Sequence, residues 1–168
     1  MHGSAFAFVQ KAKVKIKPKS TDKVVEIGSR VINGSIKRLF ENVATYTGID
    51  VIDGPGVDVV ASGADYKPDE PVDIVVCCEV LEHVDDDTAK AIIKNSLKML
   101  NDGGHLILTA AGSGRNPHSA YDGAGLRSEE FYRNVSVDNI MDWVGKSDAQ
   151  ILTIEENERD NDIYAIIQ

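Results

Sequence analysis

The chain has 168 residues, a formal net charge of -9 at pH 7 and two cysteines. Its length suits a single domain, residues 1–168, because a second full domain would not fit. No apolar run approaches the roughly 20 residues of a membrane span, and no long apolar secretory segment begins the chain, so we expect a cytoplasmic protein without a membrane partner. The negative charge argues against nucleic-acid binding by the surface as a whole.

Residues 1–22 predict a short helix followed by a basic extended segment. The helix would cover residues 5–10. Lysines then alternate with other residues from Lys11 to Lys19, so an extended backbone would place five ammonium groups on one side. This side is either a solvated edge that discourages sheet-to-sheet association or a patch for phosphates. Nucleic acid could bind only through this segment.

Residues 23–53 predict a βαβ unit. A β-branched run at 24–27 is ended by Gly28, where the backbone must turn sharply or approach a ligand closely. A second apolar strand covers residues 48–52. A carboxylate near the end of such a strand can accept hydrogen bonds from ribose hydroxyls, and Asp50 holds that position.

The segment between these two strands predicts a helix. Asn33 or Ser35 can cap its first turn. Its apolar face would carry Ile36, Leu39 and Phe40.

Two more strands follow. The first covers residues 57–61, and a loop at 62–71 separates it from the second, a nearly continuous apolar run at 74–78. Such a run is typical of a central strand covered on both faces by helices. Cys77 and Cys78 would point to opposite faces of this strand, which makes a disulfide between them unfavourable and fits a reducing compartment.

Residues 79–84 leave the carboxyl end of this strand, where ligands bind in open parallel sheets. Glu79 and His83 are therefore candidate site residues. The ordinary pKa of histidine is near neutrality, so His83 could act as a base or orient an acceptor, and the alternative is a histidine that packs or caps locally.

The next helix begins at three aspartates, residues 85–87, whose charge suits the positive end of a helix dipole. The residues that follow lack the spacing of a calcium loop, so we expect no metal site there. The helix would run through Leu100 and stop at Gly103, with a fifth strand at 105–110.

Residues 111–125 predict a long, glycine-rich loop at the substrate side. Arg115 could hold an anionic substrate, and His118 or Tyr121 could contact an acceptor. The alternative is a mobile linker with ordinary polar residues.

The rest of the chain predicts two short helices and a hairpin. The helices cover residues 128–132 and 136–144. Apolar runs at 151–154 and 163–167 flank a polar connection, which predicts an antiparallel hairpin at the sheet edge.

Four features together resemble the class I S-adenosylmethionine (SAM)-dependent methyltransferases, in particular a compact branch in bacteria and phages. They are Glu26-Ile27-Gly28, Asp50 at the end of the second strand, VDIVVCCEVLEHV at 72–84 and GGHLILT at 103–109. The sequence departs from the family in its first loop, where Arg30 and Ile32 replace the usual second and third glycines.

The resemblance implies an open, Rossmann-like α/β fold. Its sheet would have seven mostly parallel strands, a C-terminal antiparallel hairpin and helices on both faces. Residues 23–111 would form the cofactor-binding half, and residues 112–168 would supply the substrate-side loop, short helices and hairpin.

The resemblance also implies SAM as cofactor. Glu26 would steady its methionine end, Gly28 would allow close approach, and Asp50 would bind the ribose. The implied cofactor-binding residues are Glu26, Gly28, Ser29, Arg30, Asn33, Asp50, Val51, Ser62, Gly63, Ala64, Glu79 and Val80. The candidate catalytic residues are His83, His118 and Tyr121, and no metal ligand is expected.

The function that follows is methyl transfer to an unidentified acceptor, driven by proximity and orientation. A catalytically inactive SAM-binding or structural protein is the first alternative, because the loop glycines are replaced. A nicotinamide-dependent oxidoreductase is the second, because Asp50 is also spaced from Gly28 as in a dinucleotide-binding unit, although Gly28 to Gly34 does not match Gly-x-Gly-x-x-Gly.

Overall fold

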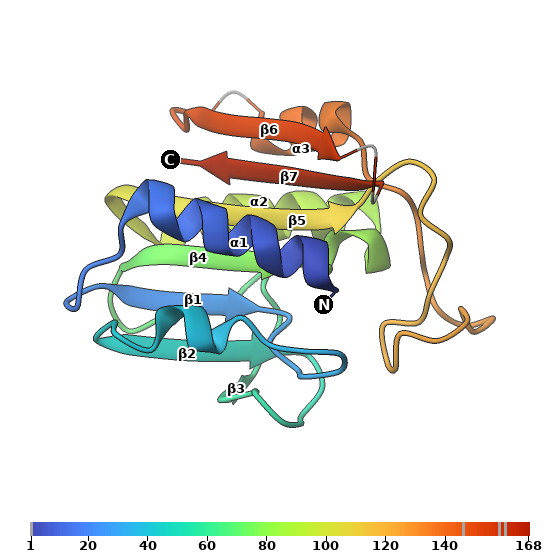
Figure 1. Cartoon of the computed structure of the whole chain (residues 1–168), viewed down its shortest axis with the longest axis horizontal. Helices are drawn as coiled ribbons and strands as arrows, with labels where there is room; N and C mark the ends of the chain where they lie inside the picture. Colours follow the sequence, from blue (N-terminus) through green and yellow to red (C-terminus); the bar gives the residue numbers. More distant parts are fainter. Residues whose placement is uncertain (1, 146, 158, 160) are drawn as a thin grey trace.

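A computed structural model describes residues 2–145, 147–157, 159 and 161–168, which form one seven-stranded sheet in the order β3-β2-β1-β4-β5-β7-β6 (Figure 1). The strands are β1 (Lys23–Ile27), β2 (Thr45–Asp50), β3 (Val59–Val60), β4 (Val72–Cys78), β5 (Leu100–Ala111), β6 (Ile151–Asn157) and β7 (Asp162–Ile167). Strands β1 to β5 pair in parallel, and β7 runs antiparallel to both β5 and β6. The predicted fold class is confirmed.

Helices cover both faces of this sheet. Helix α1 (Gly3–Ile16) and the 3₁₀ helix η1 (Lys37–Phe40) lie on the face turned to the viewer in Figure 1, and α2 (Asp86–Met99) and α3 (Val137–Val144) lie behind it. A second 3₁₀ helix, η2 (Leu81–His83), follows β4. Each face buries its own hydrophobic cluster.

Strand β4 is buried on both faces, as its continuous apolar run predicts. Ile74 and Val76 pack in the cluster under α1, whereas Val75 packs in the cluster under α2. Cys77 and Cys78 divide between the two clusters in the same way, and both are free, buried thiols. The predicted separation of the two cysteines is confirmed.

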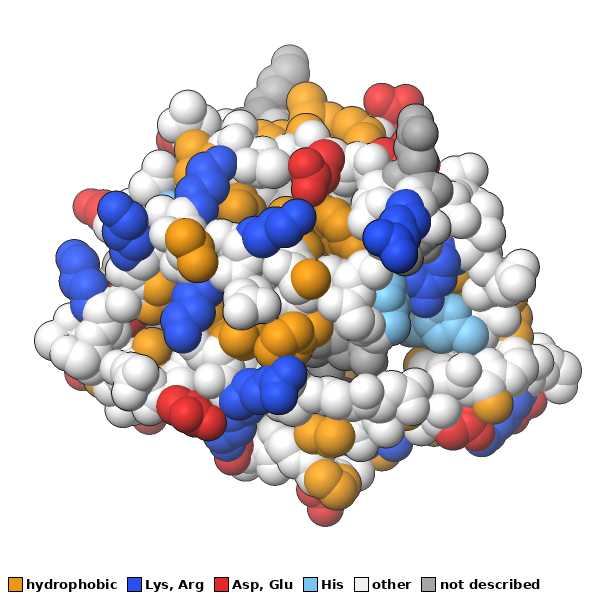
Figure 2. All heavy atoms as spheres, in the orientation of Figure 1, with side chains coloured by type: hydrophobic (Ala, Val, Ile, Leu, Met, Phe, Trp, Pro, Cys, Tyr) orange, Lys and Arg blue, Asp and Glu red, His pale blue; other side chains and the backbone are white. Residues whose placement is uncertain are grey.

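The prediction of a basic extended segment at residues 11–19 is wrong. Helix α1 continues to Ile16, and Lys17 ends it in a left-handed conformation with φ 53°. Ala5, Phe8 and Ala12 recur at helical spacing and are buried, so packing against the sheet outweighs the alternation in the sequence. Successive helical residues point in different directions, so the lysines of α1 do not form one row. Basic side chains as a whole are scattered over this face (Figure 2).

The predicted helix between β1 and β2 is reduced to the single turn of η1. Its N-cap is Ile36, without a side-chain cap, and Ser35 Oγ instead accepts a hydrogen bond from Lys37 N at 3.1 Å. Ile36, Leu39 and Phe40 are buried as expected. The apolar pattern therefore identified the buried face, but a tight 3₁₀ turn suffices to bury it.

Helices α2 and α3 begin where the sequence predicts. Asp85 Oδ1 accepts a hydrogen bond from Thr88 N at 2.8 Å, and Ser136 forms a capping box with Asn139 before α3, which ends at Gly145. The end of α2 was placed too late, because the chain enters β5 directly at Leu100, which pairs with Val72.

Two other boundaries differ from the prediction. Strand β3 keeps only two exposed residues of the expected 57–61. Residues 128–132 form no helix, because the Glu130 carboxylate binds the backbone N–H groups of Ala120 and Arg127 and so ties this segment to the preceding loop. Among the described residues, no helix is long and apolar enough to cross a membrane.

Candidate functional site

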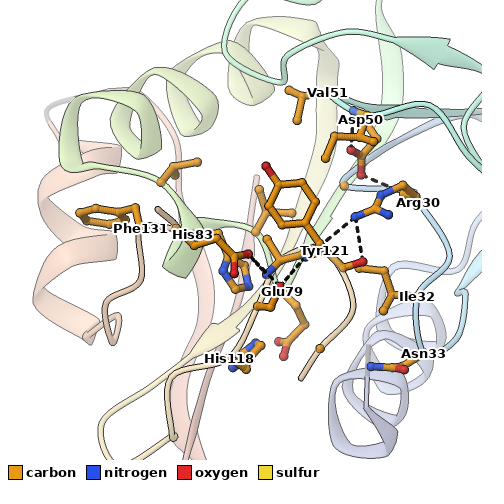
Figure 3. Close-up of a pocket in the computed structure, with 18 of the residues that line it drawn as sticks. Arg30, Ile32, Asn33, Asp50, Val51, Glu79, His83, His118, Tyr121 and Phe131 are labelled. Atoms are coloured by element: carbon orange, nitrogen blue, oxygen red, sulfur yellow. Dashed lines mark hydrogen bonds between the residues drawn. The ribbon is translucent and has the colours of Figure 1, made fainter. Parts of the chain in front are cut away.

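A cavity of about 1250 Å³ opens at the carboxyl ends of the parallel strands (Figure 3). The loops that follow β1, β2 and β4 form one side, and residues 114–131 form the other. Figure 2 shows a hollow beside the pale-blue histidine surface on this side of the molecule. Pockets for single small ligands usually measure about 300 to 1000 Å³, so this cavity has room for a cofactor and a second molecule.

Gly28 brings three of these loops together. Its φ of 76° suits glycine, and a Cβ added to it would lie 2.3 Å from Val80 Cγ2. The backbone N–H groups of Gly28 and Ser29 both donate to Ile49 O, at 2.9 and 3.0 Å. The end of β1 is thereby fixed to the end of β2, with no room for a side chain at Gly28.

Asp50 lies at the end of β2, with its carboxylate directed into the cavity (Figure 3). Oδ1 accepts a hydrogen bond from Ile52 N at 2.9 Å and Oδ2 accepts one from Arg30 N at 3.3 Å. Each carboxylate oxygen can accept two hydrogen bonds, so each keeps one free direction. Val51 follows with its side chain 66% exposed, which leaves an apolar surface beside the carboxylate.

Arg30 connects the loop after β1 to the long loop across the cavity. Its Nη2 donates to the carbonyl oxygens of Ala120 and Tyr121, at 3.1 and 3.2 Å (Figure 3). Asn33 lies close to the same loop, since a Cβ on Gly123 would meet its Nδ2 at 2.5 Å. Arg30 therefore holds residues 120 and 121 over the cavity, and Asn33 lies against the same loop.

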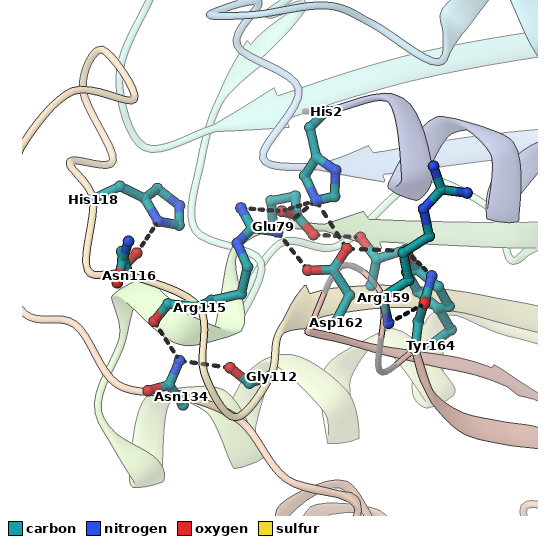
Figure 4. Close-up of polar contacts among 12 residues, drawn as sticks. His2, Glu79, Gly112, Arg115, Asn116, His118, Asn134, Arg159, Asp162 and Tyr164 are labelled. Carbon is teal, nitrogen blue, oxygen red and sulfur yellow. Dashed lines mark hydrogen bonds and ion pairs between the residues drawn. The ribbon is translucent and has the colours of Figure 1, made fainter.

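A partly buried cluster of charged residues lies near the end of β4 (Figure 4). His2 Nε2 lies 2.9 Å from Asp162 Oδ2 and 3.3 Å from Glu79 Oε2. Arg115 Nη1 lies 2.5 Å from Asp162 Oδ1, and Thr109 Oγ1 donates to Glu79 Oε1 at 2.9 Å. Glu79 has a φ of 56°, an uncommon conformation for a residue with a side chain.

These contacts set the charges of the cluster. The hydrogen bonds from His2 to Asp162 and Glu79 raise the pKa of His2 to about 9, which favours the cation at neutral pH although Arg115 Nη1 also lies 2.7 Å from His2 Nε2. Burial would raise the pKa of Glu79, but the His2 hydrogen bond and charge, with Thr109 and Arg115, hold it below its usual range. The cluster thus presents groups of both signs to the cavity.

Two imidazole rings form another part of the wall, and both pack against a tyrosine that does not line the cavity. The ring centroids of His83 and His118 are 4.9 Å apart, and each lies within 5.6 Å of the Tyr132 ring. Burial, and then the charge of His118, lower the pKa of His83 to about 4. His83 is therefore neutral at pH 7 and a weak base, with a nitrogen electron pair available for a hydrogen bond or a ligand. Figure 3 shows Tyr121 between these histidines and Asp50.

The structure brings most of the predicted site residues to the cavity but leaves three away from it. The residues that line it are Gly28, Arg30, Asn33, Asp50, Val51, Ser62, Gly63, Glu79, Val80, His83, His118 and Tyr121. Glu26, Ser29 and Ala64 are not among its lining residues. Glu26 is buried and accepts a hydrogen bond from Tyr46 Oη at 2.5 Å, and burial raises its pKa to about 7. Ala64 packs against the core cluster under α2.

Sequence reasoning missed His2 and Asp162 and assigned Arg115 differently. Arg115 was a candidate for an anionic substrate, but its guanidinium already pairs with Asp162. These residues come from the start of the chain, the long loop and β7. No local motif joins them, so only the folded sheet reveals the cluster.

Residues 2–154 match a protein family described as a methyltransferase domain. No curated protein matches the sequence. Among solved structures, a SAM-dependent methyltransferase from Clostridium acetobutylicum is similar with a TM-score of 0.75 and 11% identity, over 100% of this chain and 92% of that one.

Two further structures share the fold. The N-methyltransferase NodS from Bradyrhizobium japonicum, in complex with S-adenosyl-L-homocysteine (SAH), has a TM-score of 0.66 and 17% identity, over 96% of this chain and 84% of that one. The 1,6-didemethyltoxoflavin-N1-methyltransferase from Burkholderia thailandensis has a TM-score of 0.70 and 11% identity, over 97% and 76%. At these identities the likeness shows the fold alone.

Proposed function

Since the chain belongs to the methyltransferase domain family, we propose that it binds SAM in the cavity and transfers the methyl group to an acceptor held under the long loop. The acceptor remains unidentified. Family membership supports this function over the inactive protein and the nicotinamide-dependent oxidoreductase that the sequence left as alternatives.

The observation that carries the proposal is the Asp50 carboxylate at the end of β2. Its two oxygens each accept one hydrogen bond and can accept a second, and this suits a pair of ribose hydroxyls. Val51 offers an exposed apolar surface to an adenine ring, and Ser62 and Gly63 lie along the same cavity.

The methionine end of the cofactor would lie toward Gly28 and the charged cluster. Its ammonium and carboxylate groups carry opposite charges, and the cluster supplies both an acid, Glu79, and cations, His2 and Arg115. Glu26 does not line the cavity. We propose that it stabilises the end of β1 and the loop that follows through its hydrogen bond with Tyr46, and does not contact the cofactor.

SAM supplies an activated methyl group, and the residues of this chain have to align the acceptor and exclude water. The acceptor atom would form a bond to the methyl carbon while the carbon–sulfur electrons return to sulfur. Where the acceptor is an amine or hydroxyl, neutral His83 would orient it by hydrogen bonding, since its lowered pKa makes it a weak base. His118 and Tyr121 would position the acceptor from the long loop.

The size of the cavity favours a small acceptor, or a small part of a larger one. The sequence suggested a basic row that could bind nucleic acid, but the lysines of α1 point in different directions and form no such row. A nucleic-acid acceptor therefore has less support. A cytoplasmic site of action stays a prediction, supported by the two free thiols in β4.

Calorimetric titration with SAM, SAH and NAD tests the proposal directly. We expect SAM and SAH to bind with one site per chain and NAD not to bind. Binding of NAD without SAM would replace the proposal with a dinucleotide-dependent function, and binding of none of the three would refute cofactor binding.

A further inference from the structure

One carboxylate and two imidazoles meet at the wall of the cavity, outside the part assigned to the ribose. Glu82 and His83 belong to η2, and His118 belongs to the long loop. One ligand atom from each residue lies within 4.8 Å of the others. Ligands about 2.0 to 2.2 Å from a common zinc ion lie about 3 to 4 Å apart, so a small inward movement would complete such a geometry.

Glu82 has no side-chain partner that explains its burial. Its side chain is fully buried, and among the described residues only the backbone N–H groups of Glu82 and Ala111 lie near its carboxylate, in poor hydrogen-bond geometry. His83 Nδ1 is buried and unpaired among the same residues. Buried polar atoms without partners are costly and uncommon in folded proteins. A cation between these groups would satisfy both of them at once.

His118 has the arrangement expected of a metal ligand. Its Nδ1 lies 3.2 Å from Asn116 O, a carbonyl that can only accept, so Nδ1 carries the hydrogen and Nε2 keeps a free electron pair. Metal-binding histidines commonly donate their second N–H to a backbone carbonyl in this way, which fixes the ring orientation.

The other cluster of acidic and histidine residues in the cavity already has cationic partners. His2, Glu79 and Asp162 also lie close together, but Arg115 already pairs with Asp162 and His2 is bonded to both acids. Cationic side chains therefore occupy the position that an ion would take. Glu82 has no such pairing among the described residues.

We propose that Glu82, His83 and His118 bind a divalent transition-metal ion, with Zn²⁺ as the representative, and leave one coordination position open toward the cavity. Two nitrogen donors and one carboxylate oxygen favour such ions over Mg²⁺ or Ca²⁺. His83 and His118 line the cavity whereas Glu82 lies behind them, so the open position faces the acceptor. The ion would bind an oxygen of the acceptor, and this role rests on the proposed methyl transfer. Binding of the ion to the three residues does not depend on that function.

The test is titration of the full chain, purified without a histidine tag and stripped with EDTA, with ZnCl₂ in a calorimeter and with Co²⁺ followed by visible absorption. We expect one ion per chain and a Co²⁺ spectrum typical of four- or five-coordinate sites. Glu82→Gln and His118→Ala should each weaken binding more than tenfold, since losing an outer partner alone costs about 10- to 100-fold.

His105→Ala is the matched control, because His105 lies on β5 outside the cluster, and its affinity for Zn²⁺ should equal that of the unchanged chain. Thermal unfolding and SAM titration of each variant check that it is folded. Absence of Zn²⁺ and Co²⁺ binding in a chain that binds SAM would overturn this inference and leave the proposed function intact. Binding that survives Glu82→Gln and His118→Ala but is lost in His2→Ala would also overturn it.

Discussion

Asp50 is the residue on which cofactor binding depends most directly. Asp50→Ala should weaken SAM binding by about 1 to 3 kcal/mol, because it would leave the ribose hydroxyls without their charged acceptor. Calorimetry on the folded variant measures the change. Lys67→Ala, outside the cavity, serves as control. Equal SAM affinity of Asp50→Ala and the unchanged chain would remove Asp50 from the site.

His2 should make stability depend on pH. Its pKa is about 9 in the folded chain against an ordinary 6.5, so the folded state holds the proton more tightly. The stabilisation is complete below pH 6.5 and is lost as pH rises toward 9. We expect about 1 to 2 kcal/mol after allowance for screening of this partly exposed side chain.

Urea unfolding of the unchanged chain and His2→Ala at pH 6 and pH 9.5 measures this effect. The difference in unfolding free energy between the two proteins should be largest at pH 6 and shrink at pH 9.5. The titration of Glu26 is common to both proteins and cancels in the difference. A difference that is the same at both values would contradict the assigned role of His2.

Single residues were predictable from the sequence where a local pattern placed them. The apolar pattern identifies the two strands that end near Gly28 and Asp50. Ligands bind at the carboxyl ends of such strands, so both residues could be assigned to the site. Glu26 was recognised by position, but strand alternation turns its side chain toward Tyr46 and away from the cavity. His2 and Asp162 meet only because α1 and β7 are adjacent in the fold.

At the scale of elements, the long loop is already anchored by Arg30. Arg30→Met would remove its hydrogen bonds to Ala120 O and Tyr121 O. Bonds from a charged donor contribute about 1.5 to 3 kcal/mol, so amide exchange over residues 118–125 should accelerate about tenfold or more. Exchange in β4 should not change, which serves as the internal control.

The same experiment tests whether the loop closes over ligands. In the unchanged chain, exchange at residues 112–125 should slow when cofactor and acceptor are bound together. Equal protection with and without ligands would make the loop an ordinary connection, and the acceptor would then have to be held by His83 and the helix at the N-terminus.

The elements themselves were predictable to different degrees. Strands β1 and β4 and helices α2 and α3 have strong periodicity and clear caps, and they lie close to where the sequence placed them. Helix α1 was predicted too short because the alternating lysines imitate a strand, whereas its buried face is set by Phe8 and Ala12 packing on the sheet. Such tertiary packing is not visible in a local window.

At the scale of the molecule, two hydrophobic clusters pack the helices onto the two faces of the sheet. The loops at the carboxyl ends of the parallel strands form the cavity. The seven mostly parallel strands and the C-terminal antiparallel hairpin followed from the family resemblance and were confirmed. The meeting of Glu82 and His83 with His118 did not follow from any motif, because the long loop that carries His118 has no periodic pattern to place it.

The central claim is that SAM lies between Asp50 and the charged cluster, with the acceptor under the long loop. A crystal structure of the complex with SAH tests it most directly. The account predicts ribose hydroxyls on the Asp50 carboxylate, adenine beside Val51 and the homocysteine end near Gly28 and Glu79. SAH bound outside this cavity, or with its ribose away from Asp50, would contradict the account.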